Sequence, residues 1–150
     1  MQIGEAAAYL VFSMEGARHG LPLAGVENVE RAVEVTPFPD APFIFIGAID
    51  CRGAILPVLS MRRRLHLPER NLRASDRMII ARSSRRRLAL LVDEVLGVQL
   101  SPAADITRGD AISDGLGCIA GATRTPDGVI LIHDIERFLS EADEKALEKL

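Results

Sequence analysis

The sequence has few aromatic residues and no long apolar run, and each shortage excludes a class of protein. Aromatic residues make up 4% of the 150-residue chain, and tryptophan is absent. This argues against the stacking platforms that bind single-stranded nucleic acid. The longest apolar run, residues 41–49, is far shorter than the roughly 20 residues that a membrane helix needs. The sequence therefore predicts no direct insertion into a membrane.

Cysteine is also scarce, and the N-terminal residues lack the pattern of a secretory signal. Glu5 stands where such a signal would carry basic residues, so we expect a cytoplasmic protein. Cys51 and Cys118 are too few for a disulfide framework. Each lies in an apolar segment, where a free cysteine behaves as a small hydrophobic residue. We expect no structural disulfide bridge.

Charge is distributed unevenly along the chain, although the net charge is only −3. Residues 1–51 hold seven acids against two bases, residues 52–87 hold eleven arginines against two acids, and residues 88–150 hold twelve acids against five bases. A basic block can bind nucleic acid, or it can form the solvated rim of a protein interface. The alternative function is therefore a nucleic-acid-binding module using the Arg-rich segment 52–87. The acidic flanks and the low aromatic content disfavour it.

Residues able to perform chemistry are scattered. His19, His66 and His133 lie in three different segments, without the spacing of metal ligands. Cys118 and His133 could serve as nucleophile and base with Asp134 beside them, but no local motif supports that pair. The sequence therefore predicts no catalytic residue, no metal site and no cofactor, and we expect a binding protein.

An internal repeat is the most informative feature. Val26-Glu27-Asn28-Val29 reappears as Val92-Asp93-Glu94-Val95, and each closes an apolar run. Self-similarity of this kind predicts two modules built alike, with a seam between them. Two further segments repeat in the same order: Ile46–Ile49 matches Leu116–Ile119, and Gly53–Leu56 matches Gly128–Leu131.

Short apolar runs separated by Gly- and Pro-containing turns indicate a mainly β fold. We expect turns at residues 15–18, 52–53, 82–87 and 126–128, and a polar connector over residues 62–76. Regularly spaced short strands are typical of barrels and sandwiches rather than of parallel sheets with crossover helices. The runs predict strands over residues 9–12, 21–23, 43–49, 54–59, 78–81, 88–92, 95–100, 118–122 and 129–132.

One helix is predicted, over residues 140–150. Ser140 and Asp143 match a capping box. Ala142, Ala146, Leu147 and Leu150 share one face of the helix. We expect that face to pack on its own barrel, and docking on a partner is the alternative.

The chain resembles the CheW family of chemotaxis coupling proteins in five segments that occur in the family's order. The resemblance runs from about Tyr9 to Leu139. It implies two pseudo-symmetric, five-stranded SH3-like β-barrels packed side by side, with a short C-terminal α-helix. One CheW-like domain would span residues 6–140, with one barrel mainly in residues 15–80 and the other in residues 81–138 with the N-terminal strand. The five segments are Tyr9–Phe12, Leu21–Leu23 followed by Val26, Pro42–Ile44 before Gly47–Ile49, Arg52-Gly53 with Ile55–Val58, and Val92–Val95.

The resemblance also implies a non-enzymatic adaptor that couples a chemoreceptor to a CheA-type histidine kinase. One barrel would bind the regulatory domain of the kinase, and the groove between the barrels would take the cytoplasmic hairpin of a methyl-accepting receptor. No cofactor and no nucleic-acid partner are implied, and the protein would be recruited to receptor arrays. Carried over by position, the receptor- and kinase-binding residues are Val26, Asn28, Val29, Ile49, Arg52 and Val95.

The sequence departs from the family pattern at Asn28, Cys51 and Ser60. Many members have Glu at the position of Asn28, linked to the Arg that matches Arg52. The sequence leaves open whether Glu27 or Glu30 replaces that acid. Together with the heavy basic block, these departures predict a member adapted to a particular kinase and receptor, in a pathway other than flagellar swimming. We expect specificity to lie at Asn28, whose counterpart in the second copy would be Glu94.

Overall fold

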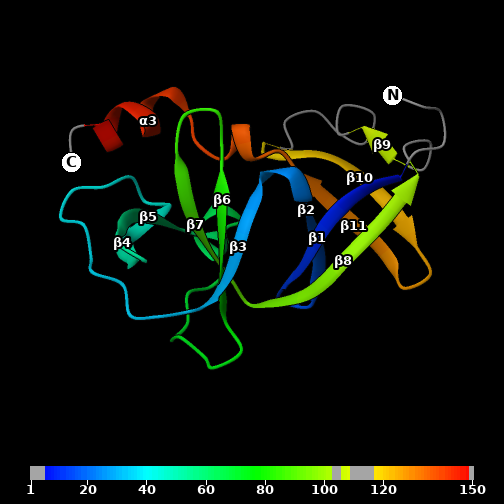
Figure 1. The fold of residues 1–150 in the computed structure, drawn as a ribbon, viewed down its shortest axis with the longest axis horizontal. Coiled ribbons are helices and arrows are strands. Elements are labelled where there is room, and N and C mark those ends of the chain that lie inside the picture. Colours follow the sequence, from blue (N-terminus) through cyan, green and yellow to red (C-terminus); the bar gives the residue numbers. More distant parts are fainter. Residues whose placement is uncertain (1–5, 103–105, 109–116, 149–150) are drawn as a thin grey trace.

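Two β-sheets make up most of the fold in the computed structural model (Figure 1). The structure describes residues 6–102, 106–108 and 117–148, so Leu116 and Leu150 lie outside the described residues. The predicted fold class is confirmed, although one sheet has six strands instead of five. The six-stranded sheet has the order β8-β1-β2-β11-β10-β9, and the five-stranded sheet has the order β3-β6-β7-β5-β4. The strands are β1 (Ala6–Met14), β2 (Ala17–Pro22), β3 (Val26–Arg31), β4 (Phe45–Cys51), β5 (Ala54–Ser60), β6 (Arg77–Arg82), β7 (Arg87–Val92), β8 (Glu94–Pro102), β9 (Ile106–Arg108), β10 (Ile119–Thr125) and β11 (Gly128–His133).

In the described residues, four short helices join these strands or follow them. They are η1 (Leu23–Gly25), α1 (Met61–Arg64), η3 (Ile135–Arg137) and α3 (Glu141–Glu148). The expected connector over residues 62–76 begins instead with a helical turn, because the Ser60 hydroxyl accepts a hydrogen bond from the Arg63 amide at 3.2 Å.

The helix α3 has the predicted capping box and packs on its own domain. The Ser140 hydroxyl accepts from the Asp143 amide at 3.1 Å, and the Asp143 carboxylate accepts from the Ser140 amide at 3.0 Å. Leu147 is buried in the main apolar cluster, and the buried Glu144 accepts a hydrogen bond from Arg86 at 2.6 Å. Of the two alternatives for this helix, the structure therefore shows packing on its own barrel.

The division of the chain between the two units differs from the expected one. The strand β2 lies with β1 in the six-stranded sheet, and β7 lies with β6 in the five-stranded sheet. The reason is that β1–β2 and β6–β7 are antiparallel hairpins with short turns, which keep both strands in one sheet. Each hairpin then gains a parallel neighbour, β11 beside β2 and β5 beside β7.

The two sheets have the same strand order, so the internal repeat is present in the fold. The residues that are equivalent in the two copies differ from those expected. The strands β3, β6, β7, β5 and β4 correspond in order to β8, β1, β2, β11 and β10. A register shift follows Val26 in β3 and Val95 in β8, so these two valines are equivalent. The counterpart of Asn28 is then Gly97 and not Glu94. The expectation that specificity lies in a mismatch between Asn28 and Glu94 loses its basis.

The same close backbone approach occurs in both copies. Thr36 pairs with Ala48 of β4, and Thr107 of β9 pairs with Ala122 of β10. A Cβ atom on Gly47 would lie 2.0 Å from the Thr36 carbonyl oxygen, and one on Gly121 would lie 2.5 Å from the Thr107 oxygen. Only glycine allows this approach.

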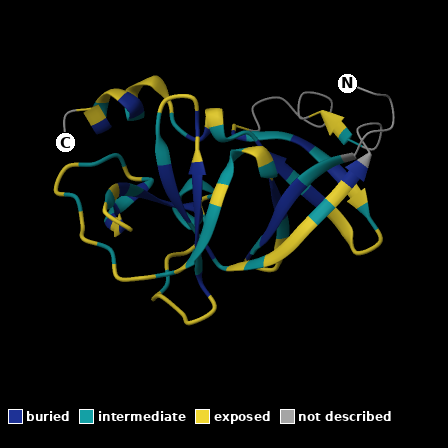
Figure 2. Cartoon of the chain, in the orientation of Figure 1, coloured by how far each residue is buried: buried dark blue, intermediate teal, exposed yellow. Residues whose placement is uncertain are grey.

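One apolar cluster lies beneath both sheets (Figure 2). Phe12 of β1 in the six-stranded sheet shares it with Phe45, Ile79 and Leu90 of the five-stranded sheet. A smaller cluster around Val58 fills the five-stranded sheet alone. The two sheets therefore share one core, and neither is expected to fold without the other.

A carboxylate network ties the sheets together where the chain passes from β7 to β8. Arg62 donates two hydrogen bonds to the Asp93 carboxylate, at 3.0 and 2.8 Å, and Arg70 forms an ion pair with the same carboxylate at 3.0 Å. Asp93 also accepts from the Glu15 amide at 2.9 Å, and Arg70 holds Asp76 at 2.8 and 2.9 Å. These contacts join the β1–β2 turn, α1 and the loop before β6.

The glycine at position 47 provides a test of the close approach. We expect Gly47→Ala to destabilise the fold by about 3 kcal/mol or more, because its Cβ would overlap the Thr36 carbonyl. In the control Gly25→Ala, the nearest atom would lie 3.7 Å from the new Cβ, so the change should stay below about 1 kcal/mol. Urea unfolding measures both variants. A Gly47→Ala variant as stable as the parent would contradict the register of β4.

The carboxylate network provides a second test. Asp93→Ala leaves Arg62 and Arg70, each at most 15% exposed, without their shared partner. We expect a loss of about 2–4 kcal/mol in the free energy of unfolding. Glu69→Ala is the matched control, because the exposed Glu69 pairs with Arg63 on the surface and should contribute about 0.5 kcal/mol or less. Equal stability of the two variants would show that Asp93 is not the anchor.

Candidate functional site

Four of the six residues carried over from the resemblance lie on β3 and β8. Val26, Asn28 and Val29 lie on β3, and Val95 lies on β8. The three valines are half-buried and pack against the apolar cluster that both sheets share. These three valines therefore contact the core that the two sheets share.

Ile49 does not join this surface. It lies on β4, is 7% exposed and belongs to the smaller apolar cluster inside the five-stranded sheet. Its side chain supports the hairpin that carries Arg52 and is not available for contact with a partner.

Arg52 lies in the β4–β5 turn with a φ of 54°, and its side chain is 73% exposed. Its Nη2 lies 3.3 Å from Oε2 of Glu30 on β3. Glu27 instead accepts from Arg82 and Arg87 at 3.1 and 2.9 Å. Of the two replacements that the sequence leaves open for the missing acid, the structure selects Glu30. Such an exposed pair stabilises the fold by at most about 1 kcal/mol, so Arg52 is available to a partner.

The Arg52–Glu30 pair also has an architectural consequence. It connects β3, an outer strand of the five-stranded order, to the turn between β4 and β5.

The structure adds an apolar row that the sequence reasoning missed. Leu96, Val98 and Leu100 are 49%, 57% and 61% exposed and alternate along β8. In the described part of the chain, β8 is an outer strand of its sheet. A hollow of about 300 Å³ borders it, lined in part by Leu96, Val98 and Arg18. The sequence did contain a sign of this row. In the run 95–100, Val95 and the alternating residues Leu96, Val98 and Leu100 are apolar, and successive side chains of a strand point to opposite faces of the sheet, so one apolar set must face outward.

The arginine block is largely neutralised by carboxylates of the same chain. Its partners come mostly from the acidic flanks, such as Glu27 and Glu144. Arg64 and Arg77 donate instead to backbone carbonyls. A nucleic-acid footprint needs basic side chains free to meet phosphates, so the alternative function is disfavoured. Within the part of the chain that the structure describes, eight of the eleven arginines form ion pairs: Arg52, Arg62, Arg63, Arg70, Arg82, Arg85, Arg86 and Arg87.

Cys118 and His133 lie together, but their surroundings oppose nucleophilic chemistry. The Cys118 sulfur lies 3.1 Å from Nδ1 of His133, whose Nε2 lies 2.7 Å from Nδ1 of His19. All three side chains are buried, and Phe12 and Phe138 contact the rings. Burial raises the pKa of the Cys118 thiol and lowers the pKa of His133 to about 3. A neutral thiol beside a neutral imidazole is the reverse of an activated pair.

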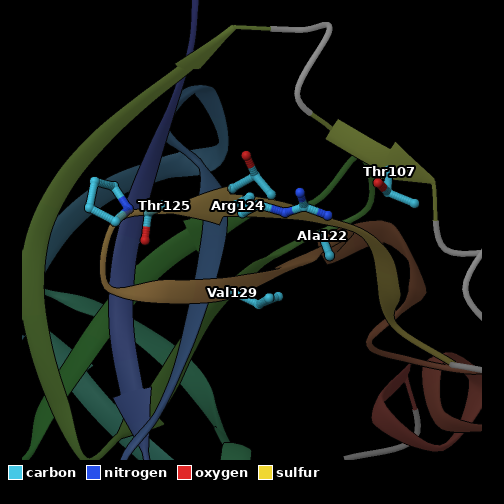
Figure 3. A pocket seen from close by; sticks show the side chains of 7 residues that line it. Thr107, Ala122, Arg124, Thr125 and Val129 are labelled. Carbon is cyan, nitrogen blue, oxygen red and sulfur yellow. The ribbon is translucent and has the colours of Figure 1, made fainter.

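Two further features bear on ligands. Within residues 6–102, 106–108 and 117–148, no three His, Cys, Asp or Glu side chains converge as metal ligands. In the same residues, no helix is both long and apolar enough to cross a membrane. A hollow of about 600 Å³ lies on the outer side of β9, β10 and β11 (Figure 3), and none of the six carried-over residues lines it.

Comparisons with known proteins agree with the geometry. A family model described as a CheW-like domain matches residues 8–143. The protein FrzA of Myxococcus xanthus is 28% identical over 145 residues, covering 94% of this chain and 90% of that protein. The chemotaxis protein CheW of Treponema pallidum is 24% identical over 147 residues, covering 94% and 85%. The crystal structure of the scaffolding protein TtCheW from Thermoanaerobacter tengcongensis has a TM-score of 0.84 at 24% identity, covering 92% and 95%. It shows the same fold.

The histidine cluster predicts a loss of stability in mild acid. Burial lowers the pKa of His19 to about 4 and that of His133 to about 3, from ordinary values near 6.5. Below pH 6.5 the unfolded chain binds protons that the folded protein does not, so stability is complete above pH 6.5 and falls as the pH drops. We expect a loss on the order of 2–3 kcal/mol between pH 6.5 and 5.

The measurement is urea unfolding over that pH range. The double variant His19→Phe/His133→Leu should show a much flatter pH dependence, while the exposed control His66→Gln should match the parent. An unchanged slope in the double variant would mean that other groups cause the acid sensitivity.

Proposed function

Because the chain belongs to the CheW-like family, as the match over residues 8–143 shows, we propose that it couples a chemoreceptor to a CheA-type histidine kinase. The protein is a CheW-like scaffold of chemotaxis-type signalling. Coupling requires one surface for the regulatory domain of the kinase and another for the cytoplasmic hairpin of the receptor. Two similar barrels in one chain provide separate surfaces for these two partners.

The observation that carries the proposal is the exposed apolar row on β8, in a fold whose carried-over valines on β3 and β8 pack against the shared apolar cluster. Isolated exposed apolar residues are ordinary, but a contiguous row on an outer strand marks an interaction site. Leu96 and Val98 supply exposed apolar area along β8, and a hollow that Arg18 also lines lies beside them. A helical hairpin binds such a surface by burying one apolar face of its helices.

Charged residues near β3 favour a receptor that carries complementary charges. The Arg52–Glu30 pair and the pair of arginines on Glu27 border β3. Rim charges of this type set orientation and association rate more than affinity. Arg52 is the most exposed of them and is therefore the residue through which we expect partner choice to act.

The proposal includes recruitment to receptor arrays and a pathway other than flagellar swimming. Its support is the set of departures in the sequence, above all Asn28 with Glu30 as the acid that pairs with Arg52. No nucleic-acid partner is proposed, since most of the arginine block is already paired within the chain.

The test is binding of purified variants to the receptor hairpin and to the kinase regulatory domain of the same organism. Arg52→Glu places an acid beside Glu30 and should weaken binding of the receptor hairpin about tenfold or more while the fold is kept. Val98→Asp should weaken it similarly. The matched controls are Arg137→Glu, which also removes an exposed arginine, and Val33→Asp, which also replaces an exposed valine.

Different outcomes of this experiment test the proposed function and the proposed binding surface. If the parent protein binds neither the kinase domain nor the receptor hairpin at micromolar concentrations, the proposed function is wrong. If both partners bind and Arg52→Glu and Val98→Asp behave like their controls, the function stands and the assigned surface is wrong.

A further inference from the structure

A further hollow, away from the β8 row, combines apolar and basic side chains. It has a volume of about 270 Å³ and lies between α1, the loop before β4 and the chain that joins η3 to α3. In Figure 1, α3 lies at the end of the molecule that β4 and β5 occupy, and β8 runs toward the other end. None of the six carried-over residues lines this hollow, which we call the α1–α3 pocket. Its lining includes Phe43, Ile44, Arg63, Arg64, Arg137 and Leu139.

The walls of the α1–α3 pocket carry exposed aromatic surface beside aliphatic side chains. Phe43 is 62% exposed, whereas the other four phenylalanines of the chain are buried or half-buried. The guanidinium carbon of Arg63 lies 4.9 Å from the centre of the Phe43 ring, so the cation and the ring attract one another. Ile44 and Leu139 are half-buried and line the same hollow. An exposed aromatic ring beside further apolar side chains and an arginine is typical of a protein-binding surface.

The charges in the α1–α3 pocket are mostly positive. Among the described residues, Arg63, Arg64 and Arg137 line it against one carboxylate, that of Asp143. Asp143 is engaged in the capping box of α3, where it accepts a hydrogen bond from a backbone amide at 3.0 Å. Arg64 donates to backbone carbonyls and forms no ion pair within the described part of the chain, and Arg137 has an exposed contact of 3.6 Å with Asp134. This excess of positive charge favours an anionic occupant.

Backbone contacts hold two of these arginines in place before any partner binds. Arg63 donates to the Phe43 carbonyl at 2.9 Å, and Arg64 donates to the Phe138 carbonyl at 3.2 Å. Arg64 is confined further by Gly117, because a Cβ atom added there would lie 3.2 Å from its Nη2 atom. Fixing a guanidinium in advance reduces the entropy that is lost when a carboxylate binds it.

We propose that the α1–α3 pocket binds an acidic segment of a partner protein, in which a large apolar side chain stands next to aspartate or glutamate. The apolar side chain would lie against Phe43 and Leu139, and the neighbouring carboxylates would meet the three arginines. Arginine suits this role because its planar fork can donate two parallel hydrogen bonds to one carboxylate. The volume of about 270 Å³ is below the roughly 300–1,000 Å³ of typical small-molecule sites, which favours one inserted side chain over a whole small ligand.

The α1–α3 pocket is separate from the surface proposed for the receptor hairpin, since none of its lining residues lies on β3 or β8. We therefore expect the acidic segment and the receptor hairpin to bind at the same time. Binding at this pocket does not depend on the proposed coupling of receptor and kinase, because it uses only the charge and the apolar surface of the pocket itself.

The experiment is an NMR titration of the isotope-labelled full chain with capped synthetic peptides. The probe peptide has one phenylalanine between pairs of glutamates. In one control peptide lysine replaces glutamate, and in the other glycine replaces phenylalanine. We expect the probe to shift the amide signals of Phe43, Arg64 and Leu139 with saturation in the millimolar range or below, and each control peptide to bind about fivefold more weakly or worse. Added salt should weaken binding of the probe, because salt screens the exposed arginines.

Two variants of the pocket have matched controls elsewhere on the surface. Phe43→Ser removes the exposed ring, and Ile55→Ser removes a similarly exposed apolar side chain outside the pocket. Arg63→Gln removes the charge and keeps a donor for the Phe43 carbonyl, and Arg124→Gln removes an exposed charge outside the pocket. We expect both pocket variants to weaken binding of the probe about fivefold or more, and both controls to match the parent protein. Urea unfolding checks that each variant keeps its fold.

Three outcomes would overturn the assignment of this pocket. One is a probe peptide that shifts no amide signal of the pocket at millimolar concentration, or that binds no better than the control peptides. Another is a pair of folded pocket variants that bind the probe like their controls. The third comes from inorganic phosphate titrated alone: if it causes the same shifts as the probe, the pocket is a simple anion site and its apolar wall has no role.

Discussion

The position of one carboxylate holds the two halves of this fold together. Asp93 lies where the chain leaves β7 of one sheet and enters β8 of the other, between the guanidinium groups of Arg62 and Arg70. Through Glu15 it also fixes the β1–β2 turn of the opposite sheet. Because the apolar cluster is common to both sheets, this junction and the cluster together fix how the sheets lie relative to one another. The placement of β8, which carries the exposed apolar row, depends on that geometry.

Much of the fold follows from the sequence, and the errors have a common physical cause. Short apolar runs and turn residues predict most of the strands, and Ser140 with Asp143 predicts the capping box of α3. The repeated segments predict the existence of a repeat. The alignment of the repeat is wrong because Val26 and Val95 each precede a register shift, which changes the facing of the strand without a mark in the sequence. The division into units is wrong because parallel pairing of β11 with β2 is a long-range contact that local patterns do not record.

The candidate site could be predicted only in part, because charge partners and exposure are properties of the folded chain. The resemblance supplies Val26, Val29 and Val95, which the structure gathers around one cluster. It also supplies Ile49, which the structure buries. That Glu30 and not Glu27 pairs with Arg52 depends on where the β4–β5 turn lies relative to β3 in the folded chain. The uneven distribution of charge along the sequence is also explained only by the fold, because acids from outside the basic block pair with most of its arginines.

Simultaneous binding of two partners tests the central claim most directly. The measurement is titration of this protein with the kinase regulatory domain, followed by the receptor hairpin, with the composition of the complex read by sedimentation. The account predicts a single complex that contains all three components, because the two barrels provide separate surfaces. If saturation with one partner prevents binding of the other, or if neither binds, the protein does not couple them.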